Sequence, residues 1–109
     1  MTPERLFEVL TKYAQSKGTE LNADKEFVME ILQGLLRNEE RYGYRSCPCR
    51  LAKGIKEKDA DIICPCAYKD ADVAEFGSCY CALYVSKEWN AGTIEHVFVP
   101  ERRPMEKMQ

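Results

Sequence analysis

Hydrophobic residues recur at helical spacing along the first third of the chain. In residues 2–17 they fall three and four positions apart, at Leu6, Phe7, Leu10, Tyr13 and Ala14. Residues 22–37 carry a longer apolar stripe, formed by Phe27, Val28, Ile31, Leu32, Leu35 and Leu36. Such spacing places apolar side chains on one face of a helix. We therefore predict two amphipathic helices, over residues 2–17 and 22–37, whose apolar faces pack into a core.

Residues at the ends of these two segments suit helix boundaries. Thr2 can cap the first helix, Pro3 fits its first position, and Gly18 follows as a stop. Asn22 is the predicted cap of the second helix, and Gly43 marks a turn beyond its end.

The helical pattern is shorter and more broken after residue 43. We predict a short helix or turn over residues 50–60, interrupted by Gly54, and a helix over residues 70–76 that Gly77 ends. A further short helix is predicted to begin at Cys81 and to run to about Trp89, before Gly92 breaks the chain.

The C-terminal part has no clear period. Residues 93–99 fit a short strand or a helical turn, and the two prolines of residues 100–104 favour an extended segment. Arg102 and Arg103 in this segment could clamp either a partner or the domain itself. Residues 105–109 are expected to be frayed.

These patterns predict a mostly α fold, a small single-domain helical protein with irregular cysteine-bearing loops. A chain of 109 residues suffices for one domain and not for two. Within the domain 1–109 we expect helical support in residues 1–40, the chemistry in residues 41–90, and an extended C-terminal segment in residues 91–109.

Charge and hydropathy argue against two classes of partner. The formal net charge of -2 gives no overall attraction to nucleic acid. No apolar run approaches the length of a membrane span, and the start MTPERLFEVL lacks the apolar stretch and cleavage site of an export signal. We therefore expect a cytoplasmic protein that binds neither nucleic acid nor membrane.

All six cysteines lie between residues 42 and 86, as three Cys-x-Cys pairs. The pairs are Cys47-Pro48-Cys49, Cys64-Pro65-Cys66 and Cys79-Tyr80-Cys81. Proline fixes φ and removes an N–H, so each of the first two pairs forms a stiff, non-helical corner. Such a corner can direct two sulfurs toward one centre, or one toward it and one away.

Six thiols in this pattern permit three kinds of chemistry. Three disulfides fit least well, because cysteines one residue apart bridge poorly and an oxidising compartment is not indicated. Zinc sites usually space their ligands more widely and need four thiols rather than six. A [4Fe–4S] cluster takes four cysteines and leaves two for a redox-active dithiol.

The quoted pairs and their flanks identify a family. YGYRSCPCR, DIICPC and CYCALYVS, in this order, resemble the catalytic (beta) chain of ferredoxin:thioredoxin reductase, over about residues 40–90. The resemblance implies a [4Fe–4S] oxidoreductase that takes electrons one at a time from ferredoxin and reduces a protein disulfide. The implied target is a thioredoxin- or glutaredoxin-like protein, and a separate non-catalytic subunit is a possible partner.

The resemblance also implies a role for each cysteine. Four match cluster ligands, namely Cys47, Cys64, Cys66 and Cys79. Cys49 matches the exposed nucleophile that attacks the target disulfide, and Cys81 matches its resolving partner, which stays against the cluster. The chain departs from the plant pattern Cys-His-Cys, because Tyr80 stands at the middle position and the only histidine is His96. A phenol is a poor proton relay at neutral pH, so what assists proton transfer is left open.

Two arginines near the first pair are auxiliary candidates. Arg45 and Arg50 could favour the Cys49 thiolate, because cations lower thiol pKa values. The basic residues around this pair could also guide an acidic ferredoxin, or could form an ordinary solvated surface. A non-enzymatic iron–sulfur electron carrier or a zinc-stabilised binding module is the alternative to a reductase.

Overall fold

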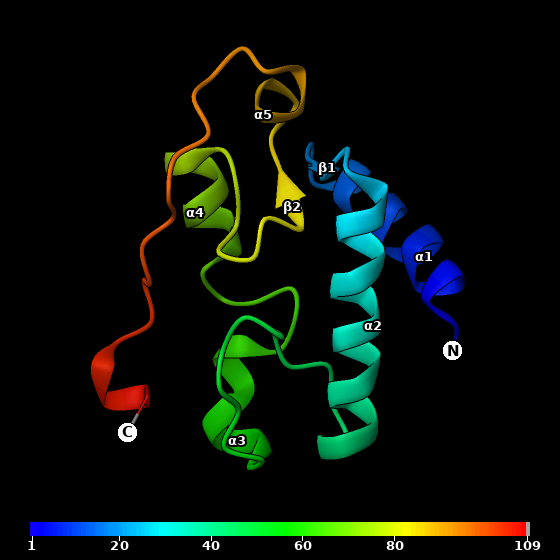
Figure 1. The fold of residues 1–109 in the computed structure, drawn as a ribbon. Helices are drawn as coiled ribbons and strands as arrows, with labels where there is room; N and C mark the ends of the chain where they lie inside the picture. Colours follow the sequence, from blue (N-terminus) through cyan, green and yellow to red (C-terminus); the bar gives the residue numbers. More distant parts are fainter. Residues whose placement is uncertain (109) are drawn as a thin grey trace.

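The computed structural model describes residues 1–108, and its first two helices form where the apolar pattern predicts them. Helix α1 spans Pro3–Ser16, and helix α2 spans Lys25–Tyr42. They pack side by side (Figure 1), and both contribute fully buried side chains, among them Leu6, Val28 and Leu32. The Thr2 side chain caps α1 by accepting a hydrogen bond from the Arg5 N–H at 3.1 Å. The amphipathic pattern thus becomes one wall of the core.

The boundaries of α2 differ from the prediction at both ends. Asp24, not Asn22, is the cap, since its carboxylate accepts the Phe27 N–H at 3.1 Å. The Asn22 side chain donates to the Ala82 carbonyl at 3.1 Å instead, far along the sequence. The helix continues to Tyr42, where Gly43 adopts a left-handed φ of 87° and stops it. The Asn22 side chain thus takes part in a long-range contact, and the helix is capped two residues later, at Asp24.

Short elements follow in the second half of the chain. They are helix α3 (Lys56–Asp59), the 3-10 turn η1 (Ala60–Ile62), helix α4 (Lys69–Phe76), helix α5 (Lys87–Ala91) and the 3-10 turn η2 (Met105–Met108). Helix α4 and its stop at Gly77 agree with the prediction. None of the helices in the described chain combines the length and the apolar character that crossing a membrane requires.

The helix predicted from Cys81 to Trp89 is wrong. Tyr84–Val85 forms strand β2, which pairs antiparallel with strand β1 (Glu20–Leu21), a strand that was not predicted. Helix α5 begins only at Lys87, after Ser86 caps it by accepting the Trp89 N–H at 3.1 Å. Pairing with a distant strand and the burial of Tyr84 outweigh the local helical spacing.

Residues 93–108, here called the C-terminal arm, run along α4 and past the cysteine loops (Figure 1). Residues 93–99 form neither the strand nor the helical turn that was predicted, whereas residues 100–104 lack regular structure as expected. Arg102 contacts Asp72 of α4 at 2.8 Å, and Arg103 contacts Asp61 at 2.8 Å. The two arginines therefore clamp the domain itself.

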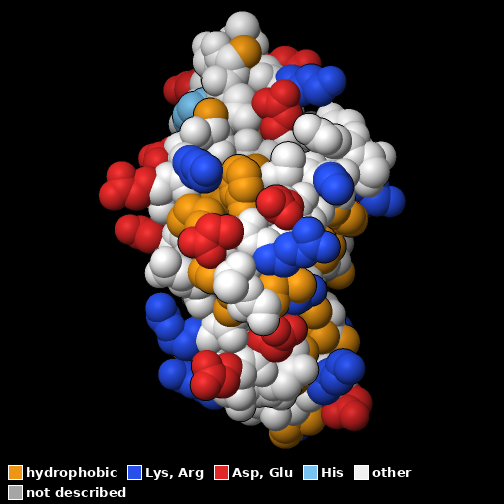
Figure 2. Space-filling model, turned by 90° about the vertical axis from the view of Figure 1, so that its right-hand side faces the viewer, with side chains coloured by type: hydrophobic (Ala, Val, Ile, Leu, Met, Phe, Trp, Pro, Cys, Tyr) orange, Lys and Arg blue, Asp and Glu red, His pale blue; other side chains and the backbone are white. Residues whose placement is uncertain are grey.

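The fold class is confirmed: the described chain is small and mostly helical, with irregular loops that carry the cysteines. The face that carries α1 and α2 shows basic and acidic side chains interspersed rather than gathered by sign (Figure 2).

Candidate functional site

The first two cysteine loops are joined by backbone hydrogen bonds. The Cys47 N–H donates to the Ile62 carbonyl and the Cys64 N–H donates to the Arg45 carbonyl, each at 2.8 Å. These bonds flank an isolated antiparallel bridge between Ser46 and Ile63. The residues before the second CPC motif thus pair through their backbones with the residues before the first CPC motif. This pairing brings the two proline corners side by side.

Helix α2 supports the first corner at a glycine. A Cβ added at Gly34 would lie 3.0 Å from the Pro48 Cβ, closer than side chains normally approach. This contact could not be predicted from the sequence, because Gly34 lies within a regular helical pattern. A side chain at position 34 would require the CPC corner to shift by a few tenths of an ångström, so glycine suits this close contact between the corner and the helix.

The third cysteine loop is a tight turn leading into β2. The Cys79 N–H donates to the Tyr84 carbonyl, and the Ala82 N–H donates to the Cys79 carbonyl, each at 2.9 Å. Ala82 adopts a positive φ of 60°, the only non-glycine residue of the described chain to do so. Strand pairing through Tyr84 therefore places Cys79 and Cys81 facing the other two loops.

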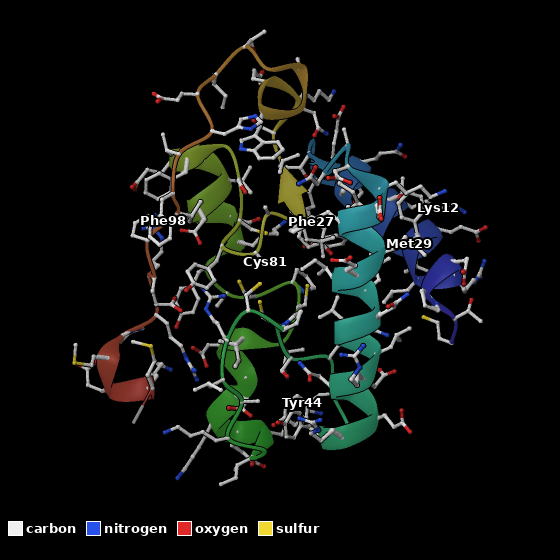
Figure 3. All side chains as sticks on the ribbon, viewed as in Figure 1. Lys12, Phe27, Met29, Tyr44, Cys81 and Phe98 are labelled. Carbon is white, nitrogen blue, oxygen red and sulfur yellow. The ribbon has the colours of Figure 1, made fainter. Side chains whose placement is uncertain are left out.

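Five of the six cysteines line one cavity. They are Cys47, Cys64, Cys66, Cys79 and Cys81, and the same cavity is lined by Arg50, Lys69, Tyr80 and Tyr84. Figure 3 shows sulfur atoms gathered beside the labelled Cys81. Cys49 is the exception, because it is exposed and borders a separate groove of about 170 Å³ with Leu51, Arg103 and Met108.

Cys81 connects the cavity with the exposed thiol. The sulfurs of Cys47, Cys49 and Cys81 all lie within 4.8 Å of one another, and the Cys79 and Cys81 sulfurs are 3.9 Å apart. All six thiols are unpaired. The Cys81 thiol is therefore close enough to form a bond either with the Cys49 sulfur or with a group held in the cavity.

The cavity suits a metal bound by thiolates. Its cysteines are soft sulfur donors, which select zinc or iron–sulfur clusters over hard cations. The Tyr84 hydroxyl, which is buried in the same wall, has no hydrogen-bond partner among the described residues. An orphaned donor of this kind would gain a partner if a group with acceptor atoms filled the cavity. The residues present therefore fit such a group.

The thiols differ in acidity according to their surroundings. The pKa of Cys49 is lowered, first by hydrogen bonds from the Cys47 and Cys81 thiols, with a smaller contribution from the Arg50 charge. Burial raises the pKa of Cys64, and neighbouring thiols raise it further. The hydrogen bonds with Cys47 and Cys49 raise the pKa of Cys81. The most exposed thiol is therefore the one that ionises most readily.

Two buried cations line the cysteine cavity. The Arg50 side chain is 2% exposed, and its Nη1 donates to the Cys66 sulfur at 3.4 Å. The Lys69 side chain is 3% exposed, and its Nζ lies 3.0 Å from an Asp70 carboxylate oxygen and 5.0 Å from the centre of the Tyr84 ring. Lys69 was missed by the sequence analysis, because a lysine at the start of a charged helix gives no sign of burial.

The structure places the remaining candidates in different surroundings. The Tyr80 ring lies against the Arg50 guanidinium, 4.4 Å from its centre. Arg45 pairs with Glu39 at 3.4 Å, whereas the charge of Arg50 is among the causes that lower the pKa of Cys49. His96 stacks on the Trp89 ring at 3.6 Å and does not line the cysteine cavity, so it does not fold back onto the thiols.

Comparison with known proteins gives consistent matches. The family model described as "Ferredoxin thioredoxin reductase catalytic beta chain" matches residues 2–108. A "Ferredoxin-thioredoxin reductase, catalytic chain" of Porphyra purpurea is 31% identical over an alignment of 81 residues, with 70% of this chain and 63% of that protein covered. Proteins of the same name from Pyropia yezoensis and Guillardia theta are each 30% identical, over 64% and 72% of their lengths and 70% of this chain.

The match spans slightly less than two thirds of the Porphyra and Pyropia proteins. The family model, in contrast, covers this chain almost from end to end, including all three Cys-x-Cys pairs. The resemblance predicted from the cysteine motifs is thereby confirmed, and the chain belongs to the family of ferredoxin thioredoxin reductase catalytic beta chains.

Proposed function

We propose that this protein is a [4Fe–4S] disulfide reductase, which passes electrons one at a time from ferredoxin to the disulfide of a thioredoxin- or glutaredoxin-like protein. One observation carries the proposal: five thiols surround a cavity, and the sixth is exposed while its sulfur stays within 4.8 Å of a cavity thiol. An electron carrier or a zinc module has no use for that exposed thiol.

The residues divide into ligands and exchanging thiols. Cys47, Cys64, Cys66 and Cys79 would hold the cluster, which when bound supplies one-electron transfer beside the dithiol. On this proposal residues 41–90 are the catalytic region, residues 1–40 support it, and residues 91–109 form the C-terminal segment. Chemistry that depends on reduced thiols belongs in a reducing compartment, for which we propose the cytoplasm.

Cys49 and Cys81 would carry out the disulfide exchange. The Cys49 thiolate attacks one sulfur of the target disulfide, whose other sulfur leaves as a thiolate and takes a proton, and a mixed disulfide forms. Cys81 then attacks the Cys49 sulfur, which releases the second target thiol and leaves a Cys49–Cys81 disulfide. Two electrons, delivered singly by ferredoxin, and two protons return this pair to the dithiol.

The surface beside Cys49 supports a protein target. Leu51, two residues further on, is 92% exposed and borders the same groove as Cys49. An exposed leucine next to a reactive thiol can pack against the apolar surroundings of a partner's disulfide. Whether a non-catalytic subunit also binds is decided by purifying the chain with and without candidate partners.

The test uses protein purified without oxygen, analysed for iron, sulfide and zinc. We expect about four irons per chain, and EPR spectra that change when the reduced protein is alkylated with N-ethylmaleimide. Cys49→Ser should keep its iron and lose disulfide reduction, whereas the matched variant Cys66→Ser should lose iron. Zinc without iron would refute the proposal. Disulfide reduction that survives Cys49→Ser would refute the role of Cys49.

A further inference from the structure

The Arg50 guanidinium forms part of the wall between the cysteine cavity and the outside. It borders the cavity with the five thiols, and it also borders the groove that contains Cys49. Its Nη1 donates to the Cys66 sulfur at 3.4 Å. A buried cation that hydrogen-bonds a cysteine sulfur stabilises negative charge on that sulfur.

A carboxylate of the C-terminal arm holds Arg50 in this place. Glu101 accepts hydrogen bonds from Nε and from Nη2 of Arg50, each at 2.9 Å. The Tyr80 and Tyr68 rings lie 4.4 Å and 5.4 Å from the guanidinium. A buried cation that loses its carboxylate partner is strongly disfavoured, so without Glu101 the Arg50 side chain would turn toward water.

The arm fixes Glu101 through the residues that follow it. The Glu101 Oε1 also accepts the Arg103 N–H at 2.9 Å, and the Arg103 side chain is clamped to Asp61 at 2.8 Å. Arg102 ties the arm to α4 through Asp72 and Glu75, and it makes no contact with Arg50. The chain therefore offers two arm residues, one that holds Arg50 and one that only anchors the arm.

We propose that Glu101 is a positioning residue, which keeps Arg50 on the Cys66 sulfur and thereby closes the cysteine cavity and raises the reduction potential of the group that the cavity thiols hold. The part that concerns the potential rests on the proposed cluster. Hydrogen bonds to cluster sulfurs, local charge and solvent exposure are the protein's means of setting such potentials.

The direction of the change in potential distinguishes positioning from a simple charge effect. Glu101→Ala removes a negative charge, which by itself would raise the potential of a nearby cluster. If Glu101 acts by holding Arg50, the same variant also releases a cation from Cys66, and the potential falls. In a protein that already carries Arg50→Gln there is no guanidinium to release from Cys66, so adding Glu101→Ala should no longer lower the reduction potential.

The experiment is a redox titration of the iron-loaded protein, with Glu101→Ala and the control Arg102→Ala compared by circular dichroism first. We expect a lower midpoint potential for Glu101→Ala, an unchanged one for Arg102→Ala, and no fall when Arg50→Gln is already present. Glu101→Gln, which keeps the shape of the side chain, replaces the alanine variant if that does not fold. A rise in potential, or an equal fall in Arg102→Ala, would overturn the positioning role.

A second measurement needs no metal. In the reduced protein, with or without metal, modification of Arg50 by the arginine reagent phenylglyoxal, located by mass spectrometry, should be several-fold faster in Glu101→Ala than in the parent or in Arg102→Ala, because the Arg50 side chain is 2% exposed in the parent. An unchanged rate of modification would overturn the claim that Glu101 keeps Arg50 over Cys66. A chain that binds no iron would refute the proposed function, while this modification would still decide the positioning.

Discussion

A single buried carboxylate stabilises the loop that follows the first CPC corner. Asp59, which is fully buried, accepts hydrogen bonds from the Tyr44 hydroxyl at 2.5 Å and from the backbone N–H groups of Lys53 and Gly54 at 3.0 Å. Tyr44 lies between the ends of α2 and α3 (Figure 3). Asp59 thus connects three segments, one of which is the chain directly after the first cysteine pair.

Asp59→Asn keeps the shape of this side chain and removes its charge. The carboxamide can accept fewer of the three hydrogen bonds, because its NH₂ group must face a donor. The bonds that remain lose the charge of their acceptor, so at about 1 kcal/mol for each of the three bonds lost or weakened the expected loss of stability is about 3 kcal/mol. For a domain of this size that loss lowers Tm by roughly 10–20 °C.

The effect should depend on pH in one direction. Although burial alone would raise the pKa of Asp59, the bonds from Tyr44, Lys53 and Gly54 hold this pKa below its usual value. A carboxyl group with a lowered folded pKa stabilises the protein above its ordinary pKa, and this contribution is lost as the pH falls through the folded value. The gap between parent and variant should therefore stay constant from pH 7 to about pH 5 and narrow only below about pH 4.

Thermal unfolding followed by circular dichroism, on iron-loaded protein at several pH values, measures this gap. Glu30→Gln, which removes an exposed carboxylate of α2, is the control and should leave Tm nearly unchanged. A Tm for Asp59→Asn equal to that of Glu30→Gln would contradict the stabilising role of the buried Asp59 carboxylate. A gap that widens toward low pH would refute the sign of the linkage.

Three further predictions follow from the packing. Gly34→Ala should lower Tm and disturb iron binding, because overpacking against Pro48 costs about 1–3 kcal/mol and exceeds the gain of roughly 1 kcal/mol in helix propensity. The control Gln33→Ala, on the exposed face of α2, should change neither Tm nor iron binding. Leu32→Ala, in the buried stripe of α2, should destabilise the protein by about 2–5 kcal/mol in thermal unfolding, and a loss below 1 kcal/mol would contradict its place in the core. Removing iron with a chelator should lower the Tm of the parent protein, because binding energy that is present only in the folded state is lost; an unchanged Tm would show that the cysteine loops are stable without it.

Features that depend on neighbours in the sequence were predicted well. Helix α1 and helix α4 form within a residue or so of the predicted ranges, because apolar spacing, a Thr2 cap and the Gly77 stop are local signals. The family followed from three closely spaced cysteine pairs and their flanks, and the family model confirms it. Such motifs can be recognised from the sequence because each pair spans only three residues.

Features that depend on distant residues could not be predicted. Leu21 pairs with Tyr84, and this pairing turned a predicted helix into strand β2. Glu101 pairs with Arg50 from 51 residues further along the chain, and nothing in the sequence around either residue indicated this pairing. The exposure of Cys49 was expected only from the family resemblance, because Cys49 and Cys66 end identical CPC motifs and the surrounding elements bury Cys66 more than Cys49. Helices α1 and α4 and the set of reactive thiols thus follow from the sequence alone. The surroundings of these thiols follow only from the fold, since burial and charge pairing arise from contacts between segments far apart in the chain.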